Sequence, residues 1–249
     1  MGIWIPCIQS FFRKDCFYLS PTAYRNLFLL LLCMTSGIVD VIGYLGLGHV
    51  FTSNMTGNIV MLGLAIGHAQ GLAVLRSGIA LIGFVVGIAI AASILGRNKE
   101  NTFWPSTVTL ILGLECLILI TFDLVSGPSV TNSTTNLLIV LLSAAMGMQT
   151  TAARCLGIAG ISTTVLTNNL ANVIEDITTL FRKAGRLKHL TLDAILRISA
   201  ILIYCFGAVI GTVVGQRYPF TVIWVPICIL VGIILTVLIR FRPSLLNQK

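Results

Sequence analysis

Residues 51–58 read FTSNMTGN, and residues 162–169 read STTVLTNN. Both stretches are polar, both follow a long apolar run, and each leads into a short segment of mixed character. At the same offset, the Leu-Gly pair at residues 45–46 falls on the Leu-Gly pair at residues 156–157. Two further matches occur in the same order along the chain, so we interpret the sequence as an internal duplication.

The apolar runs around these stretches indicate a membrane protein. The chain has 249 residues, of which 56% are hydrophobic and 10% charged, and its mean hydropathy is +0.98. Soluble domains carry roughly 25% charged residues, so this chain could not cover a water-exposed surface. In lipid every backbone amide must be satisfied internally, which makes the apolar runs helices. The uncharged runs are residues 27–39, 77–95, 105–114, 137–151, 198–216 and 219–239.

The duplication predicts an all-α, polytopic membrane protein made of two homologous halves. Each half contains a long helix, a short polar-led segment and two more long helices. The short segments, residues 56–67 and 167–180, would span about 20 Å at 1.5 Å per residue, less than the roughly 30 Å of a bilayer core. The expected divisions are an N-terminal interfacial segment (1–25), a first membrane repeat (26–126), an external loop (127–136), a second membrane repeat (137–240) and a C-terminal tail (241–249).

The distribution of basic residues favours short segments that do not cross. With six spans and both termini inside, 14 of the 16 Lys and Arg residues are cytoplasmic, and only Arg76 and Arg217 lie outside. If the short segments crossed, the inside count would fall to 12. Three spans per half is an odd number, so the second half would insert upside down, as in many secondary transporters. The eight-span alternative would give parallel repeats.

Asp40 is an ionisable residue well inside the first expected helix. An intramembrane carboxylate is a functional candidate by default, although a static ion pair or a helix cap would explain it equally. Arg154 lies nearly one turn beyond the matching position of the second half and is the natural partner. Such a pair would be a gate or coupling element, or it would only hold the two halves together. Alternatively, the side chain of Arg154 could extend to place its guanidinium group at the cytoplasmic membrane interface.

Glu115 lies at the centre of an apolar run that spans residues 105–124. Proton relays in carriers use acids at such depth, so Glu115 is a candidate for gating or proton coupling. The alternative is a neutral acid that donates a hydrogen bond to a neighbouring carbonyl.

Ser, Thr and Asn residues precede both short segments, which is the composition of helix N-caps. A helix N-terminus is also a seat for an anion or a carboxylate, and two such ends would converge under an inverted repeat. Capping alone would need the same residue types. The candidate solute-binding residues are Asp40, Asn54, Thr56, Asn58, Gln149, Thr167 and Asn169.

Small residues recur at every fourth position in two of the expected helices and allow close helix packing in lipid. They also offer an interface for a homodimer. The cysteines and histidines show no ligand spacing, so we expect neither a metal nor a cofactor, and the net charge of +8 indicates orientation rather than nucleic-acid binding. The packing glycines are Gly83, Gly87, Gly207, Gly211 and Gly215.

Several of these motifs together resemble the YoaK-like family of uncharacterised bacterial membrane proteins. The resemblance rests on residues 37–40 (GIVD), 51–58, 146–149 (MGMQ) with Arg154, and 163–167 (TTVLT). It implies a multi-pass protein of the bacterial inner (plasma) membrane, with both termini cytoplasmic on our charge count, and it implies no substrate. The chain departs from the family pattern at two positions, Thr150 and Asn168.

The leading functional hypothesis is a small secondary transporter or channel-like protein for a small polar solute or anion. The alternative is a membrane scaffold or sensor whose polar breaks hold the two halves together. An intramembrane enzyme is not indicated, because the sequence contains no Ser/His/Asp set, HExxH motif or Cys/His arrangement.

Overall fold

The structure is a computed structural model that describes residues 20–68, 71–96, 103–127, 131–156, 166–182, 191–218 and 220–240. The expected tail (241–249), and all but the end of the expected interfacial segment (1–25), lie outside these residues. Within the described ranges the chain is helical and contains no strand, which confirms the all-α fold class.

Six helices are long and apolar enough to cross a membrane, among the residues that could be searched. Two shorter helices, α2 (Met55–Gly67) and α6 (Leu166–Arg182), correspond to the two short segments. The six spans are α1 (Pro21–Val41) continued by the π-helix η1 (Ile42–Gly46), α3 (Gly71–Leu95), α4 (Ser106–Val125), α5 (Asn132–Cys155), α7 (Leu192–Arg217), and α8 (Trp224–Arg240) preceded by the 3-10 helix η2 (Thr221–Ile223).

Hydroxyl residues cap three of these spans. The side-chain oxygens of Ser20, Thr131 and Thr191 accept hydrogen bonds from backbone amides three residues ahead, at 3.2, 3.3 and 3.2 Å. Each bond satisfies one of the amides that a helix start leaves without an intrahelical partner. The cap at Thr131 starts α5 at Asn132, inside the segment that the sequence assigned to the external loop.

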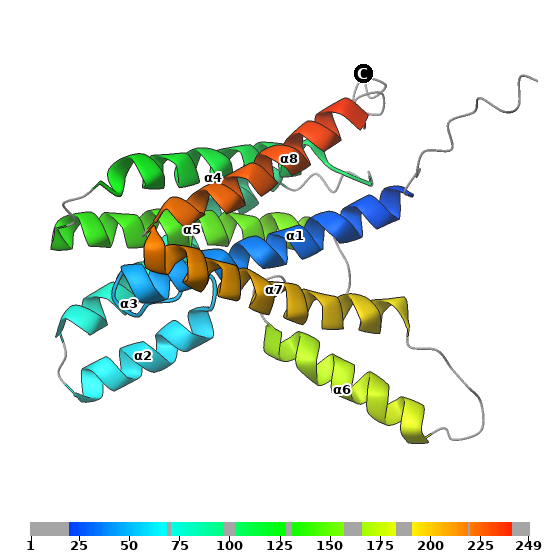
Figure 1. Cartoon of the computed structure of the whole chain (residues 1–249), viewed down its shortest axis with the longest axis horizontal. Coiled ribbons are helices and arrows are strands. Elements are labelled where there is room, and N and C mark those ends of the chain that lie inside the picture. The colour runs from blue at the N-terminus through cyan, green and yellow to red at the C-terminus, as the bar shows by residue number, and fades with distance from the viewer. Residues whose placement is uncertain are drawn as a thin grey trace, which may run out of the picture.

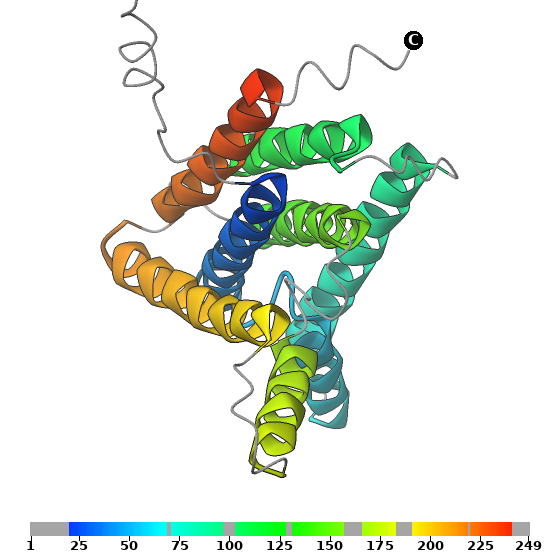
Figure 2. The ribbon, with the colours of Figure 1, turned by 90° about the vertical axis from the view of Figure 1, so that its right-hand side faces the viewer.

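Helices α1 and α5 are the most buried of the six spans, and each packs against helices of the other half. In their most apolar windows these two helices are 67% and 61% buried, whereas α3 and α7 are 22% and 17% buried. The first helix of each half, α1 or α5, packs against the third helix of the other half. Helix α1 therefore lies along α7, and α5 lies along α3 (Figures 1 and 2). Each half therefore buries the helix that the other half leaves uncovered.

Glycines make these two helix pairs close. A Cβ at Gly37 of α1 would fall on the carbonyl oxygen of Tyr204 in α7, and a Cβ at Gly147 of α5 would fall on the carbonyl oxygen of Phe84 in α3. Gly87 and Gly207 form a second matched set, facing the carbonyl oxygens of Ala144 and Met34. In three dimensions Gly87 therefore corresponds to Gly207, one turn away from the sequence match of Gly83 with Gly207.

The atoms that an added Cβ would meet also show which surfaces the packing glycines face. Gly83 faces Val140 and Ser143 of α5, and Gly211 faces Ile38 and Val41 of α1. A Cβ at Gly215 would meet no atom within 4 Å. Apart from Gly215, the packing glycines thus face helices of their own chain, so these stripes are not free to form the homodimer interface that we considered.

The helix directions are those that an inverted repeat would have. Figure 1 shows α1 and α5 running in opposite directions, and α2 and α6 leaving the middle of the bundle toward opposite ends. Figure 2 shows α2 and α6 on the same side of the bundle. This arrangement is consistent with an inverted-topology duplication, which remains a prediction.

Candidate functional site

The carboxylate of Asp40 accepts five hydrogen bonds from two segments of the chain, the loop before α2 and helix α7. Its Oδ1 accepts from the backbone amides of Thr52 and Ser53 at 2.7 and 2.6 Å and from the Thr52 hydroxyl at 3.1 Å. Its Oδ2 accepts from the hydroxyls of Ser53 and Tyr204, each at 2.6 Å. All five donors are neutral, and Asp40 is 3% exposed.

The chain reaches this geometry through a break at the end of α1. The helix loosens into the π-helix η1, and Gly48 and His49 then turn the backbone with φ values of +91° and +63°. A Cβ at Gly43 would lie 2.6 Å from the carbonyl oxygen of Val50, so this glycine allows the returning chain to approach α1 closely. The turn places Thr52 and Ser53 against Asp40, and π-helical segments of this kind are frequent at functional sites.

Two asparagines hold the returning loop in place. Asn58 accepts a bond from the Phe51 amide at 2.9 Å and donates one to the Phe51 carbonyl oxygen at 2.5 Å. Asn54 is the N-cap of α2 and accepts from the Gly57 amide at 3.3 Å. The loop that leads into α2 therefore presents two amides to the carboxylate of Asp40. The sequence had placed a carboxylate or anion at the N-terminus of the short helix itself, and that site stays a prediction.

A cavity of about 330 Å³ opens beside Asp40, between α1 and α7. We call it the Asp40 pocket. Residues of the first half form one wall and residues of the second half the other, and none of the described residues that line it is basic. They are Gly37, Asp40, Val41, Tyr44, Leu45, Phe51, Tyr204, Ala208 and Thr212.

A second cavity of about 330 Å³ shares two of these residues and lies further toward the end of α7. We call it the glycine pocket. Its walls are apolar or backbone, apart from the side chain of Gln216. It is lined by Val41, Ile42, Leu45, Gly46, Gly211, Gly215, Gln216, Phe220 and Val222.

Gln149 lies on α5 and bonds only to α1. Its Nε2 donates to the Leu32 carbonyl oxygen at 3.0 Å and to the Ser36 hydroxyl at 2.8 Å, and its Oε1 accepts from the Thr35 hydroxyl at 2.7 Å. The residue is fully buried and its amide is engaged at both ends. It joins the two central helices and does not line the Asp40 pocket.

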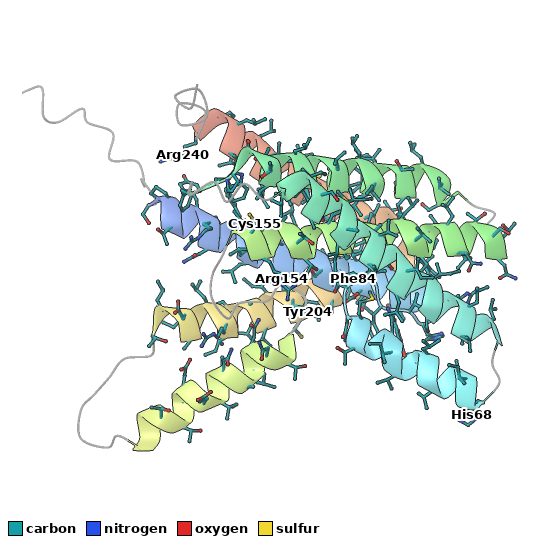
Figure 3. The ribbon with its side chains drawn as sticks, turned by 180° about the vertical axis from the view of Figure 1, so that it is seen from behind. His68, Phe84, Arg154, Cys155, Tyr204 and Arg240 are labelled. Atoms are coloured by element: carbon teal, nitrogen blue, oxygen red, sulfur yellow. The ribbon has the colours of Figure 1, made fainter. Side chains whose placement is uncertain are left out.

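The remaining candidates from the sequence do not gather around Asp40. Arg154 is exposed, and within the described ranges it forms no ion pair with Asp40. Figure 3 labels Arg154 and Tyr204 with the side chains around them. Thr56 and Thr167 are exposed and Asn169 is buried at the start of α6. The second-half residues that align with Thr52 and Ser53, Thr163 and Thr164, lie outside the described part of the chain.

Glu115 occupies the buried face of α4. It is 0% exposed, and neither carboxylate oxygen has a hydrogen-bond partner among the residues that the structure describes. Its neighbours on the same face, Leu112 and Leu119, are also fully buried. Burying a polar group without a partner costs roughly 1–3 kcal/mol, so the position of this acid is energetically unfavourable and calls for an explanation.

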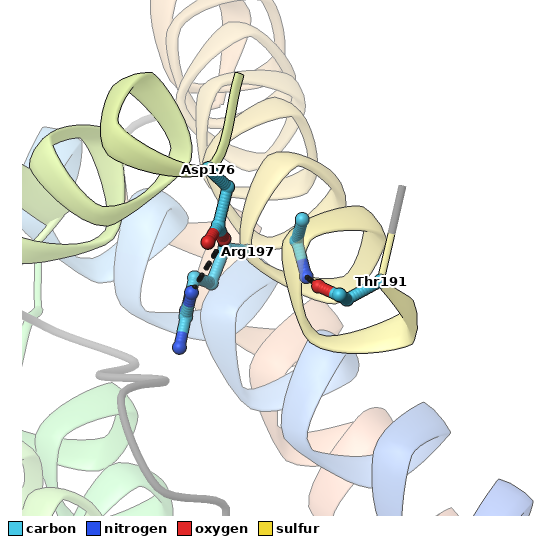
Figure 4. A network of polar contacts seen from close by, with 4 residues as sticks. Asp176, Thr191 and Arg197 are labelled. Atoms are coloured by element: carbon cyan, nitrogen blue, oxygen red, sulfur yellow. Dashed lines mark hydrogen bonds and ion pairs between the residues drawn. The ribbon is translucent and has the colours of Figure 1, made fainter. Parts of the chain in front are cut away.

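The sequence did not identify any of the three residues that donate to Asp40, which are Thr52, Ser53 and Tyr204. Tyr204 had a detectable signal, because it is a hydroxyl-bearing residue inside the uncharged run 198–216. Reasoning from sequence also missed the ion pair between Asp176 of α6 and Arg197 of α7, at 2.9 Å, which Figure 4 shows beside the Thr191 cap. That pair fastens the short helix α6 to α7.

Comparisons with known proteins agree with the membrane fold. Residues 28–236 match the profile of the family described as protein of unknown function (DUF1275). The chain is also similar to the UPF0700 transmembrane protein YoaK of Bacillus subtilis (strain 168), with 51% identity over 219 residues, which cover 88% of this chain and 96% of that relative. No solved structure matches the chain.

Proposed function

The chain is a multi-pass membrane protein of the DUF1275 family, and from its geometry we propose that it is a small secondary transporter or channel-like protein for a small polar solute. The observation that carries the proposal is the Asp40 pocket, a cavity between the two halves with a buried carboxylate in its wall. Inverted-repeat transporters bind their substrates at the interface of the repeats, beside discontinuous helices.

Three features of the pocket support this role. Its two walls come from different halves, so a rocking motion of one half against the other would open or close it. Tyr204 lies near the middle of the 26 residues of α7, so the pocket lies within the depth of a span. The short helix α2 begins directly after the loop that holds Asp40, as in transporters with broken helices.

We further propose a multi-pass placement in the bacterial inner membrane with both termini cytoplasmic. The chain enters α1 and leaves α8 at the same end of the bundle (Figure 1). Arg25 near the start of α1 and Arg240 at the end of α8 mark this end, while Arg76 and Arg217 belong to the other. The positive-inside rule would orient the basic end toward the cytoplasm. Figure 3 shows this end at Arg240 and the opposite end at His68.

One observation favours the alternative, a scaffold or sensor that transports nothing. The polar groups of Asp40 and Gln149 are fully hydrogen-bonded within the protein, which is expected of residues whose role is to hold the two halves together. In that case the Asp40 pocket would be packing space, and substitutions in its wall would change stability without changing any ligand response.

A ligand screen separates the two functions. The full-length protein in lipid nanodiscs would be heated with small cations, anions, amino acids, nucleobases and sugars, because a ligand at 100 times its dissociation constant stabilises by about 2.7 kcal/mol. The variants are Tyr44→Leu in the pocket wall and Tyr218→Leu, which makes the same change at the exposed end of α7, outside the pocket. A shift that Tyr44→Leu removes and Tyr218→Leu keeps, followed by flux of that compound into liposomes, supports transport. A flat screen with intact folding supports the scaffold.

A further inference from the structure

The polar groups around the Asp40 pocket restrict how a solute could be recognised. The Tyr204 hydroxyl already donates to Asp40, and the Thr212 hydroxyl already donates to the Ala208 carbonyl oxygen at 2.9 Å. The two oxygens of Asp40 accept five bonds, one more than the roughly four lone-pair sites of a carboxylate, so no site is left for a solute. A sugar or polyol, which needs several free donors and acceptors, would find few of them here.

Two features of the pocket remain available to a solute, which are the charge of Asp40 and the aromatic side chains of the lining. Asp40 contributes a formal negative charge, and its five donor groups, on Thr52, Ser53 and Tyr204, supply no compensating cation. A carboxylate in a water-poor site attracts a cation much more strongly than it would in bulk water, and it repels an anion equally. The pocket is therefore unsuited to the anion that the sequence allowed as a solute.

Three aromatic residues line the pocket beside this charge. The rings of Tyr44 and Phe51 stack on one another, with centroids 5.2 Å apart and planes 25° apart, and both line the pocket together with Tyr204. Cations bind over the faces of aromatic rings, and quaternary ammonium groups are held in this way in aromatic cages. The neighbouring glycine pocket adds apolar walls without charge, which would receive the hydrocarbon part of the same molecule.

We propose that the Asp40 pocket binds an organic cation, of the class of quaternary or alkylated ammonium compounds. This inference rests on the proposed function, whose solute it identifies by class. Charge and ring faces would hold the ammonium group, and the volume of about 330 Å³ lies at the small end of ligand pockets.

Three compounds of nearly equal shape test the charge requirement. Choline is the cation, 3,3-dimethylbutan-1-ol is its uncharged isostere, and pivalate is an anion that carries the same tert-butyl group. Binding would be measured by calorimetry on the full-length protein in nanodiscs of phosphatidylethanolamine and phosphatidylglycerol, which contain no choline headgroup. We expect choline to bind at least tenfold more tightly than the alcohol and pivalate not to bind.

Four variants place the binding in this pocket. Tyr44→Leu removes an aromatic wall without touching the Asp40 hydrogen bonds, and Asp40→Asn removes the charge. We expect each to weaken choline binding about tenfold or more. Asp123→Asn and Tyr218→Leu make the same chemical changes outside the pocket and should leave binding unchanged. Because Asp40→Asn disturbs the loop before α2, Tyr44→Leu decides the outcome if that variant fails to fold.

An ammonium group could belong to a free solute or to a lipid headgroup. Phosphatidylcholine added to the nanodiscs would compete with choline if the pocket takes headgroups and would leave its affinity unchanged if it takes free solutes, and both results support the cation class.

Other outcomes overturn the inference and separate it from the proposed function. If pivalate or an uncharged compound from the screen binds better than choline, and Tyr44→Leu weakens that binding, the site is real but its solute is not a cation. If no compound of any charge binds, both the cation and the transport proposals fail.

Discussion

The Tyr204 hydroxyl on α7 donates a 2.6 Å hydrogen bond to Oδ2 of Asp40 on α1, across 164 positions of the chain. The bond links the two halves directly, at the helix pair where Gly37 lets the backbones approach. It also completes the set of donors that holds Asp40 in the pocket wall. Stability and the pocket geometry therefore depend on the same contact.

Replacing Tyr204 with Phe should lower the free energy of unfolding by about 2 kcal/mol, because a hydrogen bond to a charged group is worth roughly 1.5–3 kcal/mol. Equilibrium unfolding in bicelles would measure the change. The control is Tyr218→Phe at the exposed end of α7, where we expect less than about 0.5 kcal/mol. Equal effects at the two tyrosines would contradict the role of the Asp40 bond.

The helix pairs α1–α7 and α3–α5 predict a matched response to alanine. Gly37→Ala and Gly147→Ala each place a methyl group on a backbone carbonyl oxygen of the partner helix, which cannot move aside as a flexible side chain could. We expect each to destabilise the protein by about 1–3 kcal/mol, the usual cost of overpacking.

Gly113→Ala on α4 is the control for these two variants, because its added Cβ meets no atom within 4 Å. Alanine favours a helix over glycine by about 1 kcal/mol, so Gly113→Ala should be neutral or slightly stabilising. If Gly37→Ala destabilises and Gly147→Ala does not, the two helix pairs are not equivalent, and the inverted repeat loses its packing support.

Much of this fold could be predicted from local sequence. The uncharged runs predicted the spans because a bilayer requires about 20 apolar residues per helix, and the polar stretch before residue 55 predicted the start of α2 because Asn54 caps it. Interlocking of α1 with α7 could not be predicted in this way. It depends on which helix covers which, and that is settled by packing between residues far apart in sequence.

The candidate site was predictable only in part, for the same reason. Asp40 was identified because an intramembrane acid is rare. Its partners were not, since the turn at Gly48 and His49 decides which groups reach it. The sequence favoured Arg154 as a partner through the pseudo-two-fold axis, whereas in the structure Asp40 is satisfied by its own loop and Tyr204.

Gln149→Leu should destabilise the protein by about 2 kcal/mol. The substitution removes three hydrogen bonds between α5 and α1, although Thr35 and Ser36 keep their bonds to the Leu32 carbonyl oxygen. Ligand binding should be unchanged, because Gln149 does not line the Asp40 pocket. A loss of binding with unchanged stability would instead assign Gln149 to the solute, as the sequence proposed.

Cysteine labelling checks the orientation of the chain. In a variant without its seven native cysteines, Thr131→Cys should react with a membrane-impermeant maleimide on intact cells. Ser20→Cys should react only after permeabilisation, because the starts of α1 and α5 lie at opposite ends of the bundle (Figure 1). The reverse pattern would place both termini outside and contradict the charge argument.

Glu115 provides the sharpest contrast with Gln149, since both are fully buried and, among the described residues, the side chain of Gln149 has hydrogen-bond partners and that of Glu115 has none. Glu115→Leu replaces an unpartnered carboxyl group with an apolar side chain of similar size. We expect it to raise the free energy of unfolding by about 1–3 kcal/mol, measured by equilibrium unfolding in bicelles. A destabilised Glu115→Leu protein would show that the carboxyl group has a partner such as a buried water. If Glu115→Leu is more stable but no longer supports proton-coupled uptake of the identified solute, this unfavourable acid is retained for coupling, and Glu115→Gln, which keeps the shape but carries no titratable proton, should lose the coupling as well.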